Sequence, residues 1–271
     1  MALLPPATDF TAAATQGALK TAITGLIAYL TAALGTDSVG ATGTKNLLLN
    51  GALSINQRAF AGGALAAGVY GFDRWKAGTG GCTVSVASGV VTLTGPLVQV
   101  LEAPDLAGQQ VTVSVEDPSG NLTAIVDGVS GTITAGSGRR GVTLTVPAGS
   151  TGNVTLQIAP TSGTRTFRRM QLERGPAATT YERRMLGAEL ALCQRYCYVL
   201  AARAVGSLQT AGATVYVRVG FPVTLRAAPT ISGGAGNVWD GIDAQVVDGF
   251  GVYAVNRNAV IGSGITFSAE L

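Results

Sequence analysis

The sequence predicts a mainly β protein with an N-terminal helix, a central antiparallel jelly-roll β-sandwich, a short linking helix and a smaller C-terminal β domain. Three observations predict this fold class. Hydrophobic residues make up 47% of the 271 positions, charged residues make up 12%, and 38 glycines provide for tight turns, as is typical of β modules with small side chains. Most of the chain consists of short runs in which apolar β-branched residues alternate with polar ones. Helical spacing is confined to two segments.

Residues 1–44 carry the first helical pattern and form the expected N-terminal segment. Apolar side chains recur there after four, three and four positions, which is the alternation of a short heptad seam. Because so short a helix is marginal alone, we expect it to associate with other copies of the chain, as a trimer. A helix packed on its own chain is the alternative. The seam residues are Leu19, Ile23, Leu26 and Leu30.

Residues 45–184 form the expected jelly roll, which follows a turn-rich linker. Each strand-like run places one face in the core and the other in water, because apolar and polar residues alternate along it. Gly, Pro, Asn and Asp separate the runs. Many short strands without intervening helices predict an antiparallel sandwich. The runs are 82–87, 90–94, 110–115, 131–134, 142–146 and 154–158.

A linking helix is expected at 185–200, and a distal C-terminal β domain at 201–271. The helical segment places a basic, polar face opposite its apolar positions. Beyond residue 200, alternation returns in three runs divided by glycines, at 214–221, 244–247 and 250–255. The apolar positions with helical spacing are Met185, Leu186, Leu190, Cys193, Cys197 and Leu200.

The absence of histidine shortens the list of possible catalytic sites. Without it the chain cannot form a Ser-His-Asp triad, a Cys-His pair or a zinc site that contains histidine. Carboxylate pairs could still serve glycoside hydrolysis, but each lies among turn residues where acids are common. We therefore expect a protein that is not an enzyme, with no catalytic residue, cofactor or metal. The pairs are Glu102 with Asp105, Glu116 with Asp117, and Asp240 with Asp243.

Other features favour structural interpretations. The run Gly136–Gly141 matches G-x-G-x-x-G but lies between two strand-like runs, which predicts a hairpin loop. The net charge of +3 is too small to predict nucleic acid as the main partner. The most apolar stretch, residues 18–34, is interrupted by lysine and glycine, so we expect no membrane insertion. Three cysteines, Cys82, Cys193 and Cys197, lack disulfide or zinc spacing and are expected to be small buried hydrophobes.

Two clusters of aromatic and polar side chains are candidates for sugar binding. Such a site needs an aromatic face for the apolar side of the sugar ring and planar polar groups for its hydroxyls. The first cluster contains Tyr70 and Trp75 at a strand start, where a core role is the stronger interpretation. The second lies among glycine-rich turns, and its binding and core roles stay equally open. It consists of Trp239, Asp240, Asp243, Tyr253, Asn256 and Arg257.

Four stretches stand out by their sequence rather than by their periodicity. They are Asn46–Arg58 (NLLLNGALSINQR), Gly71–Trp75 (GFDRW), Met170–Arg184 (MQLERGPAATTYERR) and Glu189–Tyr196 (ELALCQRY). Together they resemble signatures of bacteriophage and prophage tail-fibre or receptor-binding proteins. The resemblance implies that the first two stretches open a jelly-roll module like those of carbohydrate-binding domains and that the third closes it. The helix that follows would lead to a distal domain. Residues 1–44 are also similar to the particle-proximal ends of such fibres, which implies that they attach the chain to the particle.

The resemblance also implies an interaction protein, namely a fibre or spike subunit on a virion, a phage-like particle or a gene transfer agent. Its partners would be copies of itself, capsid, baseplate or fibre proteins of the particle, and polysaccharide on the host cell surface. We expect it to be made in the bacterial cytoplasm without a signal peptide. Two alternatives stay open: a short polysaccharide depolymerase that uses Asp240 and Asp243, and a structural adaptor that joins another fibre to the particle.

Overall fold

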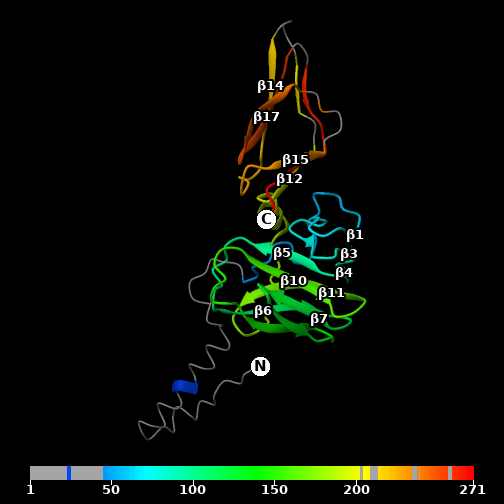
Figure 1. Ribbon diagram of the computed structural model, residues 1–271, viewed down its shortest axis with the longest axis vertical. Coiled ribbons are helices and arrows are strands. Elements are labelled where there is room, and N and C mark those ends of the chain that lie inside the picture. The colour runs from blue at the N-terminus through cyan, green and yellow to red at the C-terminus, as the bar shows by residue number, and fades with distance from the viewer. Residues whose placement is uncertain are drawn as a thin grey trace.

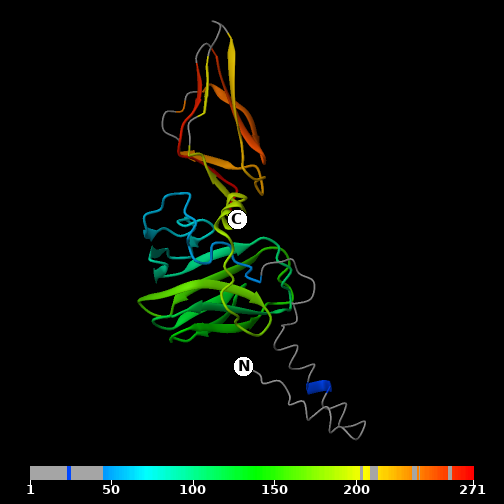
Figure 2. The same cartoon turned by 180° about the vertical axis from the view of Figure 1, so that it is seen from behind.

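The protein combines a β-sandwich with a narrow C-terminal β unit that projects from one end of it (Figure 1). The computed structural model describes residues 23–25, 45–201, 204–207, 213–233, 237, 239–255 and 258–271. Seen from behind, helix α3 (Leu186–Gln194) stands between the two parts (Figure 2). The predicted mainly β fold class is confirmed for these residues.

The sandwich consists of one six-stranded and one five-stranded sheet, with antiparallel pairing throughout. The six-stranded sheet has the order β1 (Gly63–Leu65), β3 (Cys82–Ala87), β4 (Val90–Thr94), β11 (Thr164–Arg174), β6 (Gln110–Glu116) and β9 (Arg139–Thr145). The five-stranded sheet has the order β2 (Lys76–Ala77), β5 (Leu97–Leu101), β10 (Val154–Pro160), β7 (Leu122–Val126) and β8 (Val129–Ile133). The predicted runs thus supply strands to both sheets.

The core of the sandwich forms where the apolar positions of the alternating strands meet. Val111, Val113 and Val115 of β6 are fully buried, as are Leu122 and Val126 of β7 in the other sheet. All five belong to one cluster of buried side chains, so the alternation seen in the sequence places them between the sheets.

The outer face of the six-stranded sheet is covered by the chain itself. Thr112 and Ser114 alternate with the core valines of β6 and would face water, yet they are 2% and 0% exposed. Residues 175–182, here called the strap, cross this face. The bonds that hold the strap join Thr112 Oγ1 to the Gly175 carbonyl (2.7 Å), Thr179 N–H to the Glu173 carboxylate (3.0 Å) and Glu182 N–H to Gln171 Oε1 (2.8 Å). This sheet therefore has no open face over β6.

The linking helix is shorter than predicted and buries only part of the predicted apolar set, including Cys193. Helix α3 ends at Gln194, and the expected helical residue Cys197 begins a strand that pairs with the C-terminal unit. Met185 and Leu186 are 85% and 65% exposed, whereas Glu189 is buried. Strand pairing and the ion pair between Glu189 and Arg184 thus override the spacing of apolar residues.

The C-terminal unit has three small antiparallel sheets and its own core. The strand orders are β12 (Cys197–Val199), β19 (Ile265–Ser268) and β15 (Thr230–Gly233), then β13 (Ala204–Gly206) with β18 (Ala259–Ile261), and finally β14 (Thr214–Gly220), β17 (Gly249–Val255) and β16 (Gly241–Val246). Phe250 and Phe267 lie at the centre of the core, with ring centroids 5.2 Å apart. A core separate from that of the sandwich fits the second β domain that the sequence predicts.

Glu270 fastens the C-terminal unit to the sandwich. Its carboxylate forms ion pairs with Arg58 (3.1 Å) and with Arg74, although Glu270 and Arg74 side chains are only 4% and 2% exposed. The Arg74 guanidinium also lies 3.5 Å from the centre of the Tyr196 ring. Buried charges must be paired to be tolerated, so these contacts form a connected joint between the two parts.

The segment expected to oligomerise lies largely outside the described residues. Leu19, Leu26 and Leu30 are not among them, and Ile23 falls in the helical residues 23–25 with 44% of its surface exposed. Within the described ranges, no helix has the length and apolar character needed to span a membrane.

The three cysteines are free and buried, as the sequence predicts. Burial raises the pKa of the Cys82 thiol to about 11 and also raises the pKa of Cys193 and of Cys197. Since the thiolate is the reactive form, these thiols are protected twice, by burial and by protonation.

We predict that the folded protein resists alkylation by iodoacetamide at neutral pH, while all three thiols react once it is unfolded in denaturant. Mass spectrometry of the intact protein before and after denaturation measures this. Rapid labelling of Cys193 or Cys197 in the folded protein would show that the joint opens.

We predict that Glu270→Ala lowers the free energy of unfolding by about 3 kcal/mol, because it leaves the buried Arg74 guanidinium without its carboxylate. Denaturant titration gives the value. Small-angle scattering should show that the orientation of the C-terminal unit relative to the sandwich is less restricted. The control is Arg195→Ala, which removes a half-exposed ion pair with Glu102 at the same joint and should cost under about 1 kcal/mol.

Candidate functional site

The first predicted sugar cluster belongs to the core and the joint. Trp75 is 0% exposed, and its indole N–H donates to the carbonyl of Asn50 at 2.9 Å. The Tyr70 ring lies 5.3 Å from the Arg58 guanidinium, and its hydroxyl donates to the Leu271 carbonyl at 2.6 Å. Burial and the nearby Glu270 charge raise the pKa of Tyr70. Trp75 therefore has the core role that the sequence favoured, and the Tyr70 ring and hydroxyl are engaged at the joint.

The motif around Asn50 is also structural. Asn50 adopts a left-handed conformation (φ 54°), and its amide donates to the carbonyls of Ile55 (2.8 Å) and Asp73 (3.0 Å). Its oxygen accepts the Ile55 N–H at 2.9 Å, and its backbone N–H donates to Glu189 of α3. Asparagine tolerates this conformation better than most residues. The motif therefore ties the first turn of the sandwich to the linking helix.

Trp239, in the second predicted cluster, packs into the C-terminal core. It is partly buried and meets Phe250 edge to face, with ring centroids 6.2 Å apart. Of the two roles left open by the sequence, this packing favours the core role for Trp239. Asn256 and Arg257 lie outside the described residues.

Two tyrosines form an aromatic row on the outer face of the β14–β17–β16 sheet. Tyr216 and Tyr253 are direct partners across β14 and β17, with ring centroids 6.1 Å apart and ring planes at 47°. Tyr216 is 58% exposed. The neighbouring residues Val217 and Val252 point to the other face and are buried in the C-terminal core. The row thus presents both rings on the solvent side of the sheet.

A polar row runs beside the aromatic row. Arg218 Nη2 lies 2.7 Å from Asp243 Oδ2, with the Arg218 side chain 71% exposed and the Asp243 side chain 23% exposed. Gly251 is the β17 partner of Arg218, so the ion pair crosses the sheet over a residue without a side chain. Asp240 lies close by, because its N–H donates to the Tyr253 carbonyl at 2.8 Å. We call Tyr216, Arg218, Asp240, Asp243 and Tyr253 the tyrosine face.

Gly241 sets the position of the Tyr253 ring. It is the β16 partner of Tyr253, and a Cβ atom at this position would lie 2.7 Å from the Tyr253 hydroxyl and 2.8 Å from its ring carbons. The ring therefore lies over the backbone of β16, which only glycine permits here. Together the rows offer apolar ring faces beside paired donors and acceptors, which are the groups that sugar recognition requires.

Sequence reasoning found three members of the tyrosine face and missed two. Asp240, Asp243 and Tyr253 were predicted and do lie together. Tyr216 and Arg218 were missed, although the alternation of run 214–221 already puts them on one side of their strand. Alternation along this strand does not predict that the strand pairs with β17. It is this pairing that brings the two tyrosines side by side.

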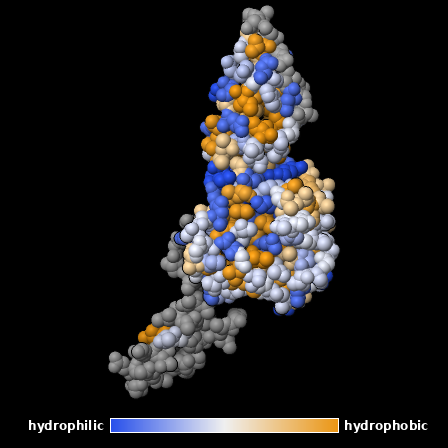
Figure 3. Space-filling model, in the orientation of Figure 1, coloured by the Kyte–Doolittle hydropathy of each residue, from blue (hydrophilic) through white to orange (hydrophobic). Residues whose placement is uncertain are grey.

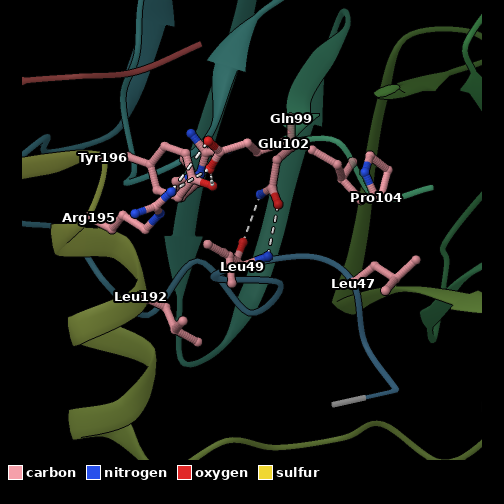
Figure 4. Close-up of a pocket in the computed structure, with 10 residues that line it drawn as sticks. Leu47, Leu49, Gln99, Glu102, Pro104, Leu192, Arg195 and Tyr196 are labelled. Carbon is pink, nitrogen blue, oxygen red and sulfur yellow. Dashed lines mark hydrogen bonds and ion pairs between the residues drawn. The ribbon is translucent and has the colours of Figure 1, made fainter. Parts of the chain in front are cut away.

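A cavity of about 310 Å³ lies at the joint, between β5 and α3. Figure 4 shows that Gln99 exchanges two hydrogen bonds with the backbone of Leu49, while Arg195 and Tyr196 point toward Glu102. Burial opposes ionisation of Glu102, but the bonds from Tyr196 and Arg195 lower the pKa of its carboxyl. These polar groups are engaged with each other, so they stabilise the joint.

Glu116 and Asp117, which were also considered for catalysis, have structural partners. Glu116 forms an ion pair with Arg169 at 3.0 Å, and Asp117 accepts the Gly138 N–H at 2.7 Å. In the described part of the chain, no three Asp, Glu or Cys residues gather in a group that could hold a metal ion.

Comparisons with known proteins identify no family for the chain. No family model matches, and no curated protein matches. Among solved structures, a chain described as "CBM4 structure and function" is similar with a TM-score of 0.30 and 16% identity, over 46% of this chain and 98% of that chain. A likeness this distant assigns no function. The site therefore has to be judged on its own geometry.

Figure 3 shows how polar character is distributed over one face of the molecule. Strongly hydrophilic residues form a band where the C-terminal unit meets the sandwich, and hydrophobic and hydrophilic residues alternate over the C-terminal unit beyond it.

We predict that Gly241→Ala displaces the Tyr253 ring while changing the free energy of unfolding by less than about 1.5 kcal/mol, since the clash falls on the mobile end of a side chain. Ring proton shifts in NMR spectra report the displacement. The control is Gly220→Ala on the same sheet, where an added Cβ meets nothing within 4 Å. Unmoved Tyr253 signals in Gly241→Ala would show that the ring does not rest on this glycine.

Proposed function

We propose that this protein is an adhesive subunit that binds cell-surface polysaccharide through the tyrosine face of its C-terminal unit. The observation that carries the proposal is the row of exposed Tyr216 and partly buried Tyr253 beside the Arg218–Asp243 pair. Aromatic rings stack on the apolar faces of sugars, and paired charged groups can donate to and accept from sugar hydroxyls.

The architecture supports placing the site in the C-terminal unit. On the sandwich, the strap covers the outer face of the six-stranded sheet over β6, and Trp75 is buried. The C-terminal unit projects away from the sandwich, so the tyrosine face can approach a large ligand (Figure 1). The joint at Glu270 holds that unit in a defined direction.

The finer proposal is that the chain is a fibre or spike subunit of a phage-like particle. Support comes from the resemblance of the four sequence stretches to tail-fibre and receptor-binding proteins. In this proposal residues 1–44 associate as a trimer and attach to capsid, baseplate or fibre proteins, and the particle surface is the protein's location. Each trimer would then carry three copies of a weak site, which together gain avidity.

We propose binding without cleavage, and the depolymerase is the alternative to exclude. Asp240 Oδ2 accepts the Val255 N–H at 2.6 Å, and Asp243 is paired with Arg218. Both carboxylates thus have partners that position them, which favours recognition over hydrolysis. Incubating the protein with a polysaccharide that it retains, followed by a reducing-end assay, separates the two: a binder releases no new ends.

We predict that Tyr216→Ala weakens adhesion of the purified protein to host cells about tenfold, because an exposed ring is lost from the centre of the site. Surface plasmon resonance on immobilised host polysaccharide measures the affinity. Val69→Ala, which trims a 46% exposed apolar side chain on the sandwich, is the matched control and should bind normally. Full adhesion of folded Tyr216→Ala together with Tyr253→Ala would contradict the proposal and favour a structural adaptor.

A further inference from the structure

We infer that arginines of β9 and β11 form a second binding site on the sandwich, which takes an oxyanion group, a carboxylate or a sulfate, of an acidic polysaccharide. The site shares no residue with the tyrosine face, so the inference stands independently of the proposed function. Three features carry it: two consecutive arginines on one face, guanidinium donors without acceptors, and a ring that holds two of the guanidiniums. We call Arg139, Arg168 and Arg169 the arginine cluster.

The arginine cluster surrounds Glu116, the last residue of β6, on the outer face of the six-stranded sheet. Arg168, Glu116 and Arg139 are successive partners across β11, β6 and β9. They face outward, because Val115 next to Glu116 belongs to the core. On the same face Arg139 Nε donates to Ser114 Oγ at 3.1 Å. One carboxylate thus has an arginine on the neighbouring strand at either side.

A bulge in β11 brings a third arginine to this face. Side chains normally alternate along a strand, so the residue after the outward-facing Arg168 would face the core. Arg169 instead adopts a left-handed conformation (φ 50°), at the register shift between Arg168 and Gln171. Its guanidinium reaches Glu116, and its side chain is 52% exposed. Arginine rarely adopts this conformation, and bulges of this kind re-aim side chains beside functional sites.

Glu116 is shared by two members of the arginine cluster. Among the described residues it is their one ion-pair partner, 3.0 Å from Arg169 and 3.8 Å from Arg139. Two further acids lie near and are turned to backbone donors. Asp117 accepts an N–H of the next hairpin, and Glu173 accepts an N–H of the strap and is only 3% exposed. Neither of these acids pairs with the arginine cluster.

The outward-facing guanidiniums therefore have donors to spare. Arg168 is exposed, and its side chain has no hydrogen bond, ion pair or ring contact with any described residue. Arg169 uses Nη1 for Glu116, whereas its Nε and Nη2 atoms donate to no described residue. Guanidinium groups bind carboxylate, sulfate and phosphate oxygens through parallel N–H bonds. Arg168 and Arg169 offer such bonds to an oxyanion that arrives from solvent.

Tyr181 of the strap holds the base of the site in place. The centre of its ring lies 5.6 Å from the Arg139 guanidinium carbon and 6.0 Å from that of Arg169. Arg139 also donates to the Arg169 carbonyl at 2.6 Å, and its side chain is 14% exposed. A guanidinium that is already ordered loses little conformational entropy when a ligand binds, which favours affinity.

The small size of the arginine cluster favours an acidic polysaccharide over a nucleic acid. Nucleic acids are bound by basic stripes that follow many closely spaced phosphates. A strand with a phosphate at every nucleotide would here meet Glu116 and Asp117 as well as the arginines. A polysaccharide with more widely spaced carboxylates or sulfates can place one of them at Arg168 and turn hydroxyl groups toward the acids.

The test is affinity electrophoresis of the full chain in native gels that each contain one polymer: alginate, dextran sulfate, dextran or duplex DNA. We expect retardation by alginate and by dextran sulfate. This retardation should decline with added sodium chloride, because the site is exposed and salt screens its charges. Dextran, which has no acidic group, measures any binding that does not need an oxyanion.

Variants locate the binding on the arginine cluster. Arg168→Gln should weaken retardation by alginate about fivefold. The matched control is Arg140→Gln, which removes the same charge from an exposed arginine on the opposite side of β9, where Arg140 is the partner of Val115. This control should bind normally. Arg169→Gly removes a guanidinium but keeps the left-handed backbone, so it should weaken binding without lowering the free energy of unfolding in denaturant titration.

Four results would overturn the inference. The first is no retardation by either acidic polymer. The second is an equal loss in Arg168→Gln and Arg140→Gln, since binding would then follow net charge alone. The third is stronger retardation by duplex DNA than by alginate at the same salt concentration. The fourth is a loss of alginate binding in Tyr216→Ala, which would place the acidic polymer on the tyrosine face. None of these four results contradicts the proposed function, which the adhesion of Tyr216→Ala tests separately.

Discussion

The buried carboxylate of Glu270 is the interaction on which the arrangement of this protein depends. This carboxylate forms ion pairs with Arg58 and Arg74, which both belong to the sandwich. Glu270 itself follows the last strand of the C-terminal unit. Removing three charged groups from water is costly, and only their mutual pairing offsets that cost. Any motion that separates the two parts would expose or unpair these charges. The joint therefore holds the C-terminal unit in one direction.

The residues that resemble fibre proteins serve mainly this joint and the fold beside it. Asn46 accepts the Leu172 N–H and donates its own N–H to Glu182, which links both ends of the sandwich. Asn50 and Arg184 both contact Glu189 of α3. Motifs of this kind identify a module because they hold it together, and they leave its ligand unspecified. The ligand has to be inferred from other side chains, which do not hold the fold together.

Much of the fold could be predicted from the sequence, but the site only in part. Alternation located about half of the described strands, because each of these buries one face, and it missed others such as β5, β7 and β11. Alternation predicted an exposed Thr112, but the strap buries this residue. Helical spacing placed Cys197 in the linking helix, but this residue begins a strand. Aromatic content alone could not separate core rings from exposed ones: Trp75 and Trp239 pack inward, while Tyr216 faces water. Whether a ring is open to a ligand depends on partners that are distant in sequence.

An open sheet face and a rigid joint are complementary properties for an adhesive protein. A binding site on the outer face of a sheet makes few contacts with each sugar, so a single site is expected to bind weakly. Linking several weak sites raises overall affinity only if their spacing allows them to engage one polymer at the same time. A C-terminal unit that swung freely would spread its site over many directions and lower the effective concentration. The pairing at Glu270 restricts that spread. In the proposed function, the buried charges of the joint would therefore contribute to adhesion without touching the ligand.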